Sequence, residues 1–226
     1  MNDDGDIQVR VLVLGASLRS SSLNDRLASL AAAVVEEKGG TVDRAHMSDF
    51  DCPSYDGDLE NAEGFPPGAE EFRRRLREAD AFILASPEYN FSMPGVLKNA
   101  IDWVSRNRPQ PFKGKHGLLM SASPSMGGGN RGLWALRQPL EHLGAHLYPD
   151  MFSLSQAHEM FSRGGRISNE KLQERFEGNV ECFLKVVEAI KHYPRIRSQW
   201  VEFLGEHPDE ATERVEEAYI GGTAGG

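Results

Sequence analysis

Short apolar runs and longer amphipathic stretches follow one another along the chain, and they predict five strands that alternate with helices. The runs at 9–16, 81–86 and 116–123 are almost continuously apolar, as is typical of parallel strands that helices cover on both faces. Two weaker strands are expected at 41–46 and at about 147–154. Apolar residues recur at helical spacing between these runs, which predicts helices at about 23–38, 69–79, 94–104, 133–143 and 169–192.

This order of elements predicts one α/β domain, in which a doubly wound, five-stranded parallel sheet carries helices on both faces. In an open sheet of this kind, the ligand binds at the carboxyl ends of the strands. Residues 47–68 are rich in Asp, Pro and Gly and lack a clear period, so we expect a long loop there.

The composition shifts after Pro194 and divides the chain into three parts. We predict a polar N-terminal segment (1–8), the α/β domain (9–194) and an acidic C-terminal extension (195–226). Within the extension, short helices are expected near 196–204 and 208–219, followed by the flexible sequence GGTAGG.

The bulk composition excludes several classes of protein. With 226 residues, 39% hydrophobic and 26% charged, the chain can form an ordinary core without a metal or a disulfide, and we expect Cys52 and Cys182 to be reduced thiols. No metal site is predicted, because the pair His142 and His146 straddles Gly144, where a helix should end. The net charge of −9 disfavours nucleic acid as a partner. No apolar run reaches about 18 residues, and the acidic N-terminus is unlike a secretory signal, so we expect no membrane partner and a cytoplasmic location.

The first strand is joined to its helix by the polar loop ASLRSSSLND, residues 16–25. Ser22 and Asp25 have capping-box spacing, which predicts that the helix begins at about Leu23. The free N–H groups and the dipole of a helix start favour an anion, and serine hydroxyls and the Arg19 guanidinium can bind phosphate oxygens. Because the loop lacks the glycines of a pyrophosphate site, a phosphate monoester fits it better. The alternative is a polar turn that only caps the helix.

Two further loops follow strand ends. Residues 86–95 (SPEYNFSMPG) combine two prolines and a glycine, which fix the backbone, with the aromatic faces of Tyr89 and Phe91. Residues 123–131 (SPSMGGGNR) contain three consecutive glycines, which let the backbone approach a ligand closely. Singly, each loop is also explained as a rigid turn or a flexible hinge. Together, at the carboxyl ends of strands, the three loops are expected to converge on one crevice.

Three strings resemble one known family. PEYNFSMPGVLKNAIDWVS (87–105) closely resembles the signature of the NADPH-dependent FMN reductase family, and GASLRSSSLN (15–24) resembles its G-S-L-R-x-x-S-x-N pattern. SASPSMGGGNRG (121–132) is similar to the family's third flavin loop. The resemblance covers roughly residues 9–192 and implies a flavodoxin-like fold with strand order 2-1-3-4-5 and bound FMN. The extension from Arg195 and the Gly-Gly-Gly-Asn run depart from the family pattern.

The resemblance also implies which residues hold the flavin. Four residues of the first loop are expected to bind the FMN phosphate: Ser17, Arg19, Ser22 and Asn24. The residues expected to border the flavin ring are Pro87, Glu88, Tyr89, Asn90 and Ser92. The other wall is expected to consist of Ser123, Ser125 and Gly127.

The activity that the resemblance implies is an FMN-dependent NAD(P)H oxidoreductase. Two electrons would pass from NADPH or NADH through FMN to a small-molecule acceptor, such as a quinone, an azo compound, free flavin or an oxidised metal ion. No dedicated acid–base residue is expected, and Tyr89 and Arg131 are candidates for contacting nicotinamide or acceptor. Two alternatives stay open: a flavodoxin-like electron carrier that does not oxidise NAD(P)H, and a non-catalytic FMN-binding regulator.

The resemblance further implies a homodimer or homotetramer. In similar proteins the helix after the loop at 86–95, called the PEYN loop below, lies near the subunit interface. This makes Lys98, Asp102 and Trp103 candidate interface residues. The alternative is an ordinary solvated helix face.

Overall fold

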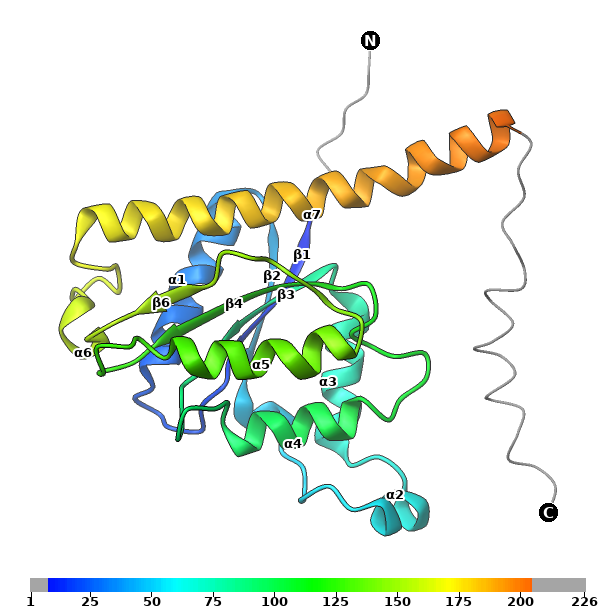
Figure 1. Ribbon diagram of the computed structural model, residues 1–226, viewed down its shortest axis with the longest axis horizontal. Helices are drawn as coiled ribbons and strands as arrows, with labels where there is room; N and C mark the ends of the chain where they lie inside the picture. The colour runs from blue at the N-terminus through cyan, green and yellow to red at the C-terminus, as the bar shows by residue number, and fades with distance from the viewer. Residues whose placement is uncertain (1–7, 205–226) are drawn as a thin grey trace. The chain divides into compact units, whose positions relative to one another are not determined.

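The computed structural model describes residues 8–204, with side chains through His192. Its strands form one parallel sheet in the order β2-β1-β3-β4-β5, which confirms the predicted order. Figure 1 labels the strands β1 to β4 and β6 of this sheet. The strands are β1 (Arg10–Gly15), β2 (Thr41–His46), β3 (Ala81–Ala85), β4 (His116–Ala122), β5 (His146–Leu147) and β6 (Phe152–Leu154). The helices are α1 (Leu23–Glu37), α2 (Gly57–Glu63), α3 (Pro67–Glu78), α4 (Gly95–Val104), α5 (Asn130–His142), α6 (Ala157–Met160) and α7 (Glu170–Leu204).

The predicted fifth strand is divided in two. β5 pairs with His116 and Gly117 at the start of β4, whereas β6 pairs with the end of β4 from Met120 onward. The four residues 148–151 therefore face only two residues of β4. Pro149 lies in this segment, and a proline has no N–H to donate to a strand ladder. The prediction of one continuous fifth strand is wrong, whereas its place beside β4 is confirmed.

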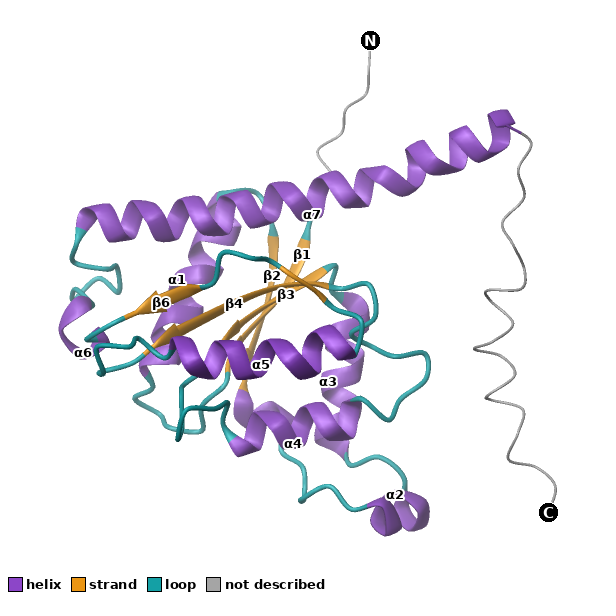
Figure 2. Cartoon of the chain, viewed as in Figure 1, coloured by secondary structure: helices purple, strands orange, loops and turns teal. Residues whose placement is uncertain are grey.

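Two hydrophobic cores cover the faces of the sheet. Helices lie on both sides of the sheet, which is the doubly wound arrangement that the pattern predicted (Figure 2). Alternate residues of each strand point to opposite cores: Val11 and Val13 of β1 face one, and Leu12 and Leu14 face the other. The first core contains buried residues of α1 and of the first half of α7, whereas the second contains residues of α3, α4 and α5. The sheet thus holds the carboxyl ends of β1, β3 and β4 at one edge, where the loops of interest begin.

The last helix is longer than the sequence pattern predicts. α7 continues past residue 192 to Leu204 and includes Pro194. A proline inside a helix removes one backbone hydrogen bond, but the helix can continue beyond it. The helix expected near 196–204 is the end of α7, and the one expected near 208–219 lies outside the described residues. The chain separates into two compact units, one of residues 8–187 and a second that includes 188–204. The predicted domain boundary at 194 falls within α7 and stays a prediction.

The segment predicted to be a long loop contains short helices. Residues 47–50 form a single 3-10 turn, and α2 begins after Asp56, whose side chain accepts a hydrogen bond from the N–H of Asp58. Between them, the backbone is held on α4: the N–H of Tyr55 donates to Oδ1 of Asn99 at 2.8 Å, and Nε1 of Trp103 donates to the carbonyl of Pro53 at 2.8 Å. This segment is therefore a fixed cover over α4.

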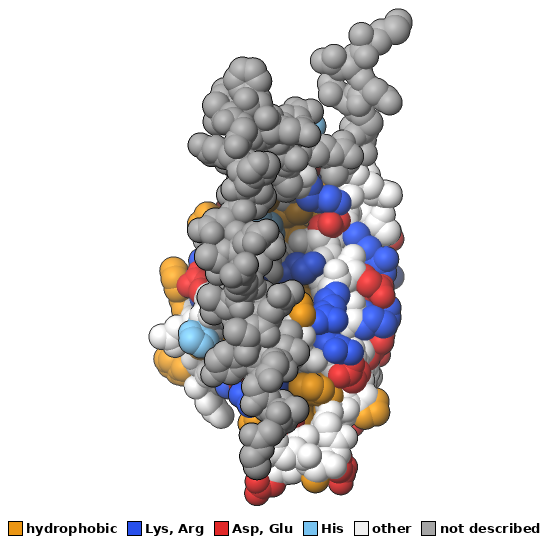
Figure 3. Space-filling model, turned by 90° about the vertical axis from the view of Figure 1, so that its right-hand side faces the viewer, with side chains coloured by type: hydrophobic (Ala, Val, Ile, Leu, Met, Phe, Trp, Pro, Cys, Tyr) orange, Lys and Arg blue, Asp and Glu red, His pale blue; other side chains and the backbone are white. Residues whose placement is uncertain are grey.

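Acidic and basic side chains lie next to one another on the face shown in Figure 3. Ion pairs of the same kind run along α3, where Arg74 contacts Glu71 at 2.8 Å and Glu78 at 2.7 Å. The hydrogen bond from Arg74, followed by that from Arg75, lowers the pKa of Glu71 to about 2. Since the Glu71 carboxylate stays ionised down to that pH, its pairs with Arg74 and Arg75 persist across the physiological range.

Candidate functional site

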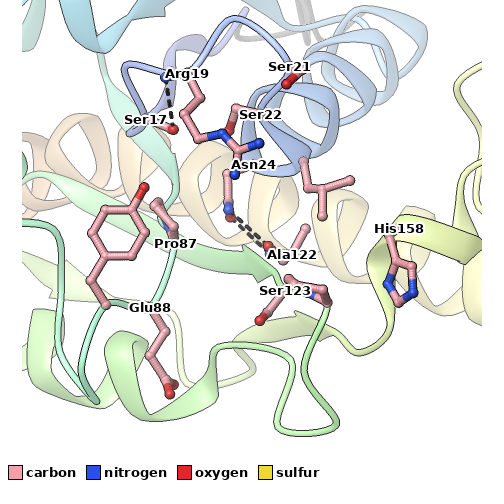
Figure 4. A pocket seen from close by; sticks show the side chains of 13 residues that line it. Ser17, Arg19, Ser21, Ser22, Asn24, Pro87, Glu88, Ala122, Ser123 and His158 are labelled. Atoms are coloured by element: carbon pink, nitrogen blue, oxygen red, sulfur yellow. Dashed lines mark hydrogen bonds between the residues drawn. The ribbon is translucent and has the colours of Figure 1, made fainter.

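The three predicted loops meet at the carboxyl edge of the sheet around a cavity of about 500 Å³ (Figure 4). The first loop and the start of α1 contribute Ser17, Arg19, Ser21, Ser22, Leu23 and Asn24. The loop after β3 contributes Pro87, Glu88 and Tyr89. The end of β4 and the loop that follows contribute Ala122, Ser123 and Pro124, and α6 adds His158. The volume lies within the range of about 300–1,000 Å³ that is usual for small-molecule sites.

The first loop presents hydroxyl groups and one guanidinium at the start of α1. Ser22 is the N-cap, and its Oγ accepts a hydrogen bond from the N–H of Asp25 at 3.3 Å, as the capping-box spacing predicted. The reciprocal half of that box is absent, since the Asp25 carboxylate pairs instead with Arg44 and lies 3.1 Å from Nδ1 of His46. The hydroxyl proton of Ser22 is left to donate elsewhere. Together with Ser17 and Arg19, it forms a donor set that suits an anion.

Asn24 joins the first loop to the third. Its Nδ2 donates to the carbonyl of Ala122 at 2.9 Å, and its Oδ1 accepts from the N–H of Ala122 at 2.9 Å (Figure 4). The residue is 3% exposed and lines the cavity. The amide therefore fixes the start of α1 against the end of β4, and only its second N–H remains for a ligand.

The PEYN loop is a tight turn with an unusual backbone. Tyr89 and Ser92 exchange two backbone hydrogen bonds of 2.9 and 3.0 Å, and the residues between them, Asn90 and Phe91, have φ of 51° and 66°. A left-handed backbone is uncommon for an aromatic residue and costs of order 1 kcal/mol or more. The turn leaves the residues Tyr89 and Phe91 47% and 65% exposed beside the cavity.

Glu88 turns its carboxylate toward α5. Oε2 accepts from the N–H of Gly132 at 3.1 Å, and Oε1 accepts from Nε of Arg131 at 3.2 Å. The Arg131 guanidinium also lies 3.6 Å from the centre of the Phe91 ring, a cation–π contact that stabilises the strained turn. In Figure 4 the Glu88 side chain points away from Arg19. Glu88, Arg131 and Phe91 thus hold the second loop against the start of α5.

The third loop reaches α5 through glycines that the packing requires. Gly129 has φ of +85°, and a Cβ there would lie 2.0 Å from Oγ of Ser121, which is buried without a hydrogen-bond partner. At Gly132, a Cβ would lie 3.1 Å from the backbone of Glu88. Both glycines let the loop and helix approach the neighbouring strand end and turn closely. The structure thereby gives a packing role to Gly129, the last glycine of the Gly-Gly-Gly run, and to Gly132 of α5.

The structure brings together most of the predicted site residues. Those of the predicted set that do not line the cavity lie on the same loops: Asn90, Ser92, Ser125 and Gly127. The cavity residues that the sequence analysis missed are Ser21, Leu23, Ala122, Pro124 and His158. Ser21 belongs to the recognised serine run, whereas nothing in the sequence pattern marks His158.

The prediction that Trp103 of α4 lies at a subunit interface is wrong. Trp103 is fully buried under the fixed segment that precedes α2, so it cannot form part of a subunit interface. Lys98 and Asp102 are partly exposed and pair with each other at 2.6 Å.

Other chemical centres are sparse in the part of the chain that the structure describes. No three His, Cys, Asp or Glu side chains among residues 8–192 are grouped so as to hold a metal ion. Cys52 and Cys182 are free thiols, and burial together with Asp51 raises the pKa of the Cys52 thiol to about 11, which makes it a poor nucleophile. Within the same residues, no helix is both long and apolar enough to cross a bilayer.

Comparison with known proteins gives consistent matches. The sequence profile of the NADPH-dependent FMN reductase family matches residues 9–159. An NAD(P)H-dependent FMN reductase of Pseudomonas aeruginosa is 40% identical over 183 residues, which cover 80% of this chain and 95% of the relative. A quinone reductase of Escherichia coli K12 is 33% identical over 190 residues, covering 81% and 98%. The flavoenzyme FerB, an NAD(P)H:acceptor oxidoreductase from Paracoccus denitrificans, superposes with a TM-score of 0.68 at 28% identity, covering 80% and 98% of the two chains.

Proposed function

Since the chain belongs to the NADPH-dependent FMN reductase family, we propose that it is an FMN-dependent NAD(P)H oxidoreductase that reduces small-molecule acceptors. The observation that carries this proposal is the convergence of the three loops on one cavity, with an anion-binding helix start at one wall and an aromatic turn at another. A flavin mononucleotide combines these two requirements in one molecule: a phosphate monoester and a flat heterocycle.

The residues present fit FMN. The phosphate would be held at the start of α1 by Ser17, Arg19 and Ser22, with Asn24 beside them. The residues proposed to border the flavin ring are Pro87, Glu88, Tyr89, Asn90 and Ser92 on one side and Ser123, Ser125 and Gly127 on the other. Glu88 would act on the ring through the position of its loop, since both of its carboxylate oxygens are engaged by α5.

When bound, the flavin supplies the hydride and electron chemistry, and the chain supplies position and surroundings. The turn at Asn90 and Phe91 and the close approach of Gly132 fix the spacing between the second loop and the start of α5. Tyr89 lines the cavity and is exposed, so its ring is available to nicotinamide or acceptor. No cavity residue is assigned a proton-transfer role.

The acceptors that we propose are quinone-like compounds and flavins, in keeping with the names of the relatives, and also azo compounds or metal ions. We also propose a homodimer or homotetramer in the cytoplasm. Lys98 and Asp102 remain interface candidates on α4, and size-exclusion chromatography with light scattering of wild type and Lys98→Ala tests the assignment.

The absorbance spectrum of the purified chain, before and after incubation with FMN, tests the cofactor, and steady-state NADPH and NADH oxidation with a quinone tests the activity. Flavin bands together with rapid quinone-dependent oxidation are expected. Bound FMN without NAD(P)H oxidation would favour an electron carrier or an FMN-binding regulator. A protein that stays colourless after incubation with FMN would contradict the proposal.

A further inference from the structure

His158 is a basic cavity residue that lies far along the sequence from the three loops. It belongs to α6, the short helix that follows β6, and it lines the same cavity as Arg19 and Ser22. In Figure 4, Asn24 and Ala122 lie between His158 and the residues Pro87 and Glu88. His158 therefore stands on the side of the cavity away from the PEYN loop.

Backbone hydrogen bonds place His158 beside the third loop. The N–H of Ser123 donates to the carbonyl of Leu154 at 3.0 Å, and the N–H of Ala157 donates to the carbonyl of Ser123 at 2.9 Å. Between these two bonds, Gln156 has φ of 48°, and this left-handed residue turns the chain into α6. His158 directly follows Ala157, so its position is fixed by the end of the sheet.

Side-chain packing ties the same segment to α1. The Arg26 guanidinium lies 4.4 Å from the centre of the Phe161 ring, and Met160 and Phe161 pack against the core that contains Leu27 of α1. Leu23, the first residue of α1, packs on that core as well. The segment that carries His158 is thus held to the third loop through Ala157 and to α1 through Phe161.

The charges of the cavity favour a second donor to an anion. Arg19 and His158 are the basic residues of the described lining, and Glu88 is its acidic residue. The Glu88 oxygens are already paired with α5, so they add little negative charge to the cavity. The His158 side chain is 51% exposed, and its Nε2 lies 3.3 Å from the exposed carboxylate of Glu159. A phosphate monoester carries close to two negative charges at neutral pH, more than one arginine and a helix start compensate.

We propose that His158 is a specificity-determining hydrogen-bond donor to a phosphate monoester bound between the start of α1 and the third loop. The inference rests on the proposed function. Two sources supply this chemistry in the proposed reaction: the 5′-phosphate of FMN and the 2′-phosphate of NADPH. His158 distinguishes FMN from riboflavin in the first case and NADPH from NADH in the second.

The test compares wild type, His158→Ala, His158→Gln and the control His142→Gln, an exposed histidine at the end of α5. Dissociation constants for FMN and riboflavin are measured by flavin fluorescence quenching on flavin-free protein, and KM values for NADPH and NADH on the flavin-loaded protein. His158→Ala is expected to weaken binding of the phosphorylated ligand about three- to tenfold, because a charged hydrogen bond at a half-exposed site is partly screened. His158→Gln, which keeps a donor, is expected to recover part of that loss.

The two sets of measurements distinguish the FMN phosphate from the NADPH phosphate. A loss for FMN without a loss for riboflavin identifies the flavin phosphate, and a KM increase for NADPH without one for NADH identifies the pyridine nucleotide. Equal losses within each pair of ligands, or no change in any, would overturn the inference while leaving FMN binding intact. Failure of the wild-type chain to bind FMN would instead contradict the proposed function, and the inference would fall with it.

Discussion

The carboxylate of Glu88 accepts a hydrogen bond from the backbone N–H of Gly132 at 3.1 Å, across 44 positions of sequence. A residue of the PEYN turn thus occupies an N–H in the first turn of α5, a position that favours a negative charge. The same carboxylate pairs with Arg131, which stacks on Phe91 of the turn. Two of the three loops of the cavity are therefore held together by one side chain that is 9% exposed.

Replacing Glu88 is expected to loosen this connection. Glu88→Ala leaves the Gly132 N–H and the Arg131 guanidinium without their carboxylate, so we expect a loss of unfolding free energy of about 1.5–3 kcal/mol in urea denaturation. Glu88→Gln keeps a hydrogen-bond acceptor and should lose less unfolding free energy. The affinities for FMN and riboflavin should fall together, because the loop position changes while the phosphate donors remain. Glu141→Gln, which removes an exposed ion-pair partner of Arg137 on the same helix, is the matched control. Unchanged flavin affinity and stability in Glu88→Ala would contradict this role.

Asn24 is expected to act mainly as a clamp between the first and third loops. Asn24→Ala leaves the N–H and carbonyl of Ala122 unpaired in a buried position, which should lower the free energy of unfolding by about 2–4 kcal/mol. Since the substitution changes the position of the loops, the affinities for FMN and for riboflavin should fall by similar factors. A loss confined to FMN, at unchanged stability, would show that Asn24 serves chiefly as a phosphate ligand.

Replacing Arg19 should weaken only the binding of the FMN phosphate. Its side chain is exposed and lines the cavity, so Arg19→Ala should weaken FMN binding by about 1.5–3 kcal/mol, the usual contribution of a charged hydrogen bond. Riboflavin affinity and the unfolding midpoint should stay as in wild type. Arg74→Ala on α3, outside the cavity, controls for loss of a surface arginine. Equal FMN affinity in wild type and Arg19→Ala would refute the assignment.

Acid pH should destabilise the fold through His116. Burial and the neighbouring His146 lower the pKa of His116, and the two rings stack at 5.1 Å. An unfolded histidine titrates near pH ~6.5, so the unfolded chain binds this proton first as the pH falls. The stability that depends on neutral His116 is therefore complete above that pH and is lost as the pH falls through the lower folded pKa. The difference in unfolding free energy between wild type and His116→Gln should shrink from pH 7.5 to pH 5, and a pH-independent difference would exclude this coupling.

Deletion of residues 195–226 should spare FMN binding. None of the cavity residues lies beyond His158, and the unit of residues 8–187 contains all of them. Fluorescence titration of the truncated and full-length chains checks this expectation. Loss of flavin on truncation would assign the extension to the site or to the assembly.

Local patterns in the sequence were sufficient for most of the strands and helices and for the meeting place of the loops. Continuous apolar runs predicted β1, β3 and β4 because strands buried on both faces need apolar residues at every position. The Ser22 cap depends on residues three apart, so it too is visible in the sequence. The rule that ligands bind at strand carboxyl ends then brought the serine loop, the PEYN turn and the glycine run to one edge.

Only the tertiary structure decided where the polar side chains of that edge point. Asn24 finds its partners 98 residues away at Ala122, and Glu88 turns from the cavity to α5, choices that depend on distances between distant segments. The break between β5 and β6 likewise depends on pairing with β4. His158 became a cavity residue because the turn at Gln156 is bonded to the third loop. Periodicity and capping act within a few residues and can be predicted from the sequence, whereas the direction of a side chain and its partner are set by packing between segments that only the folded chain brings together.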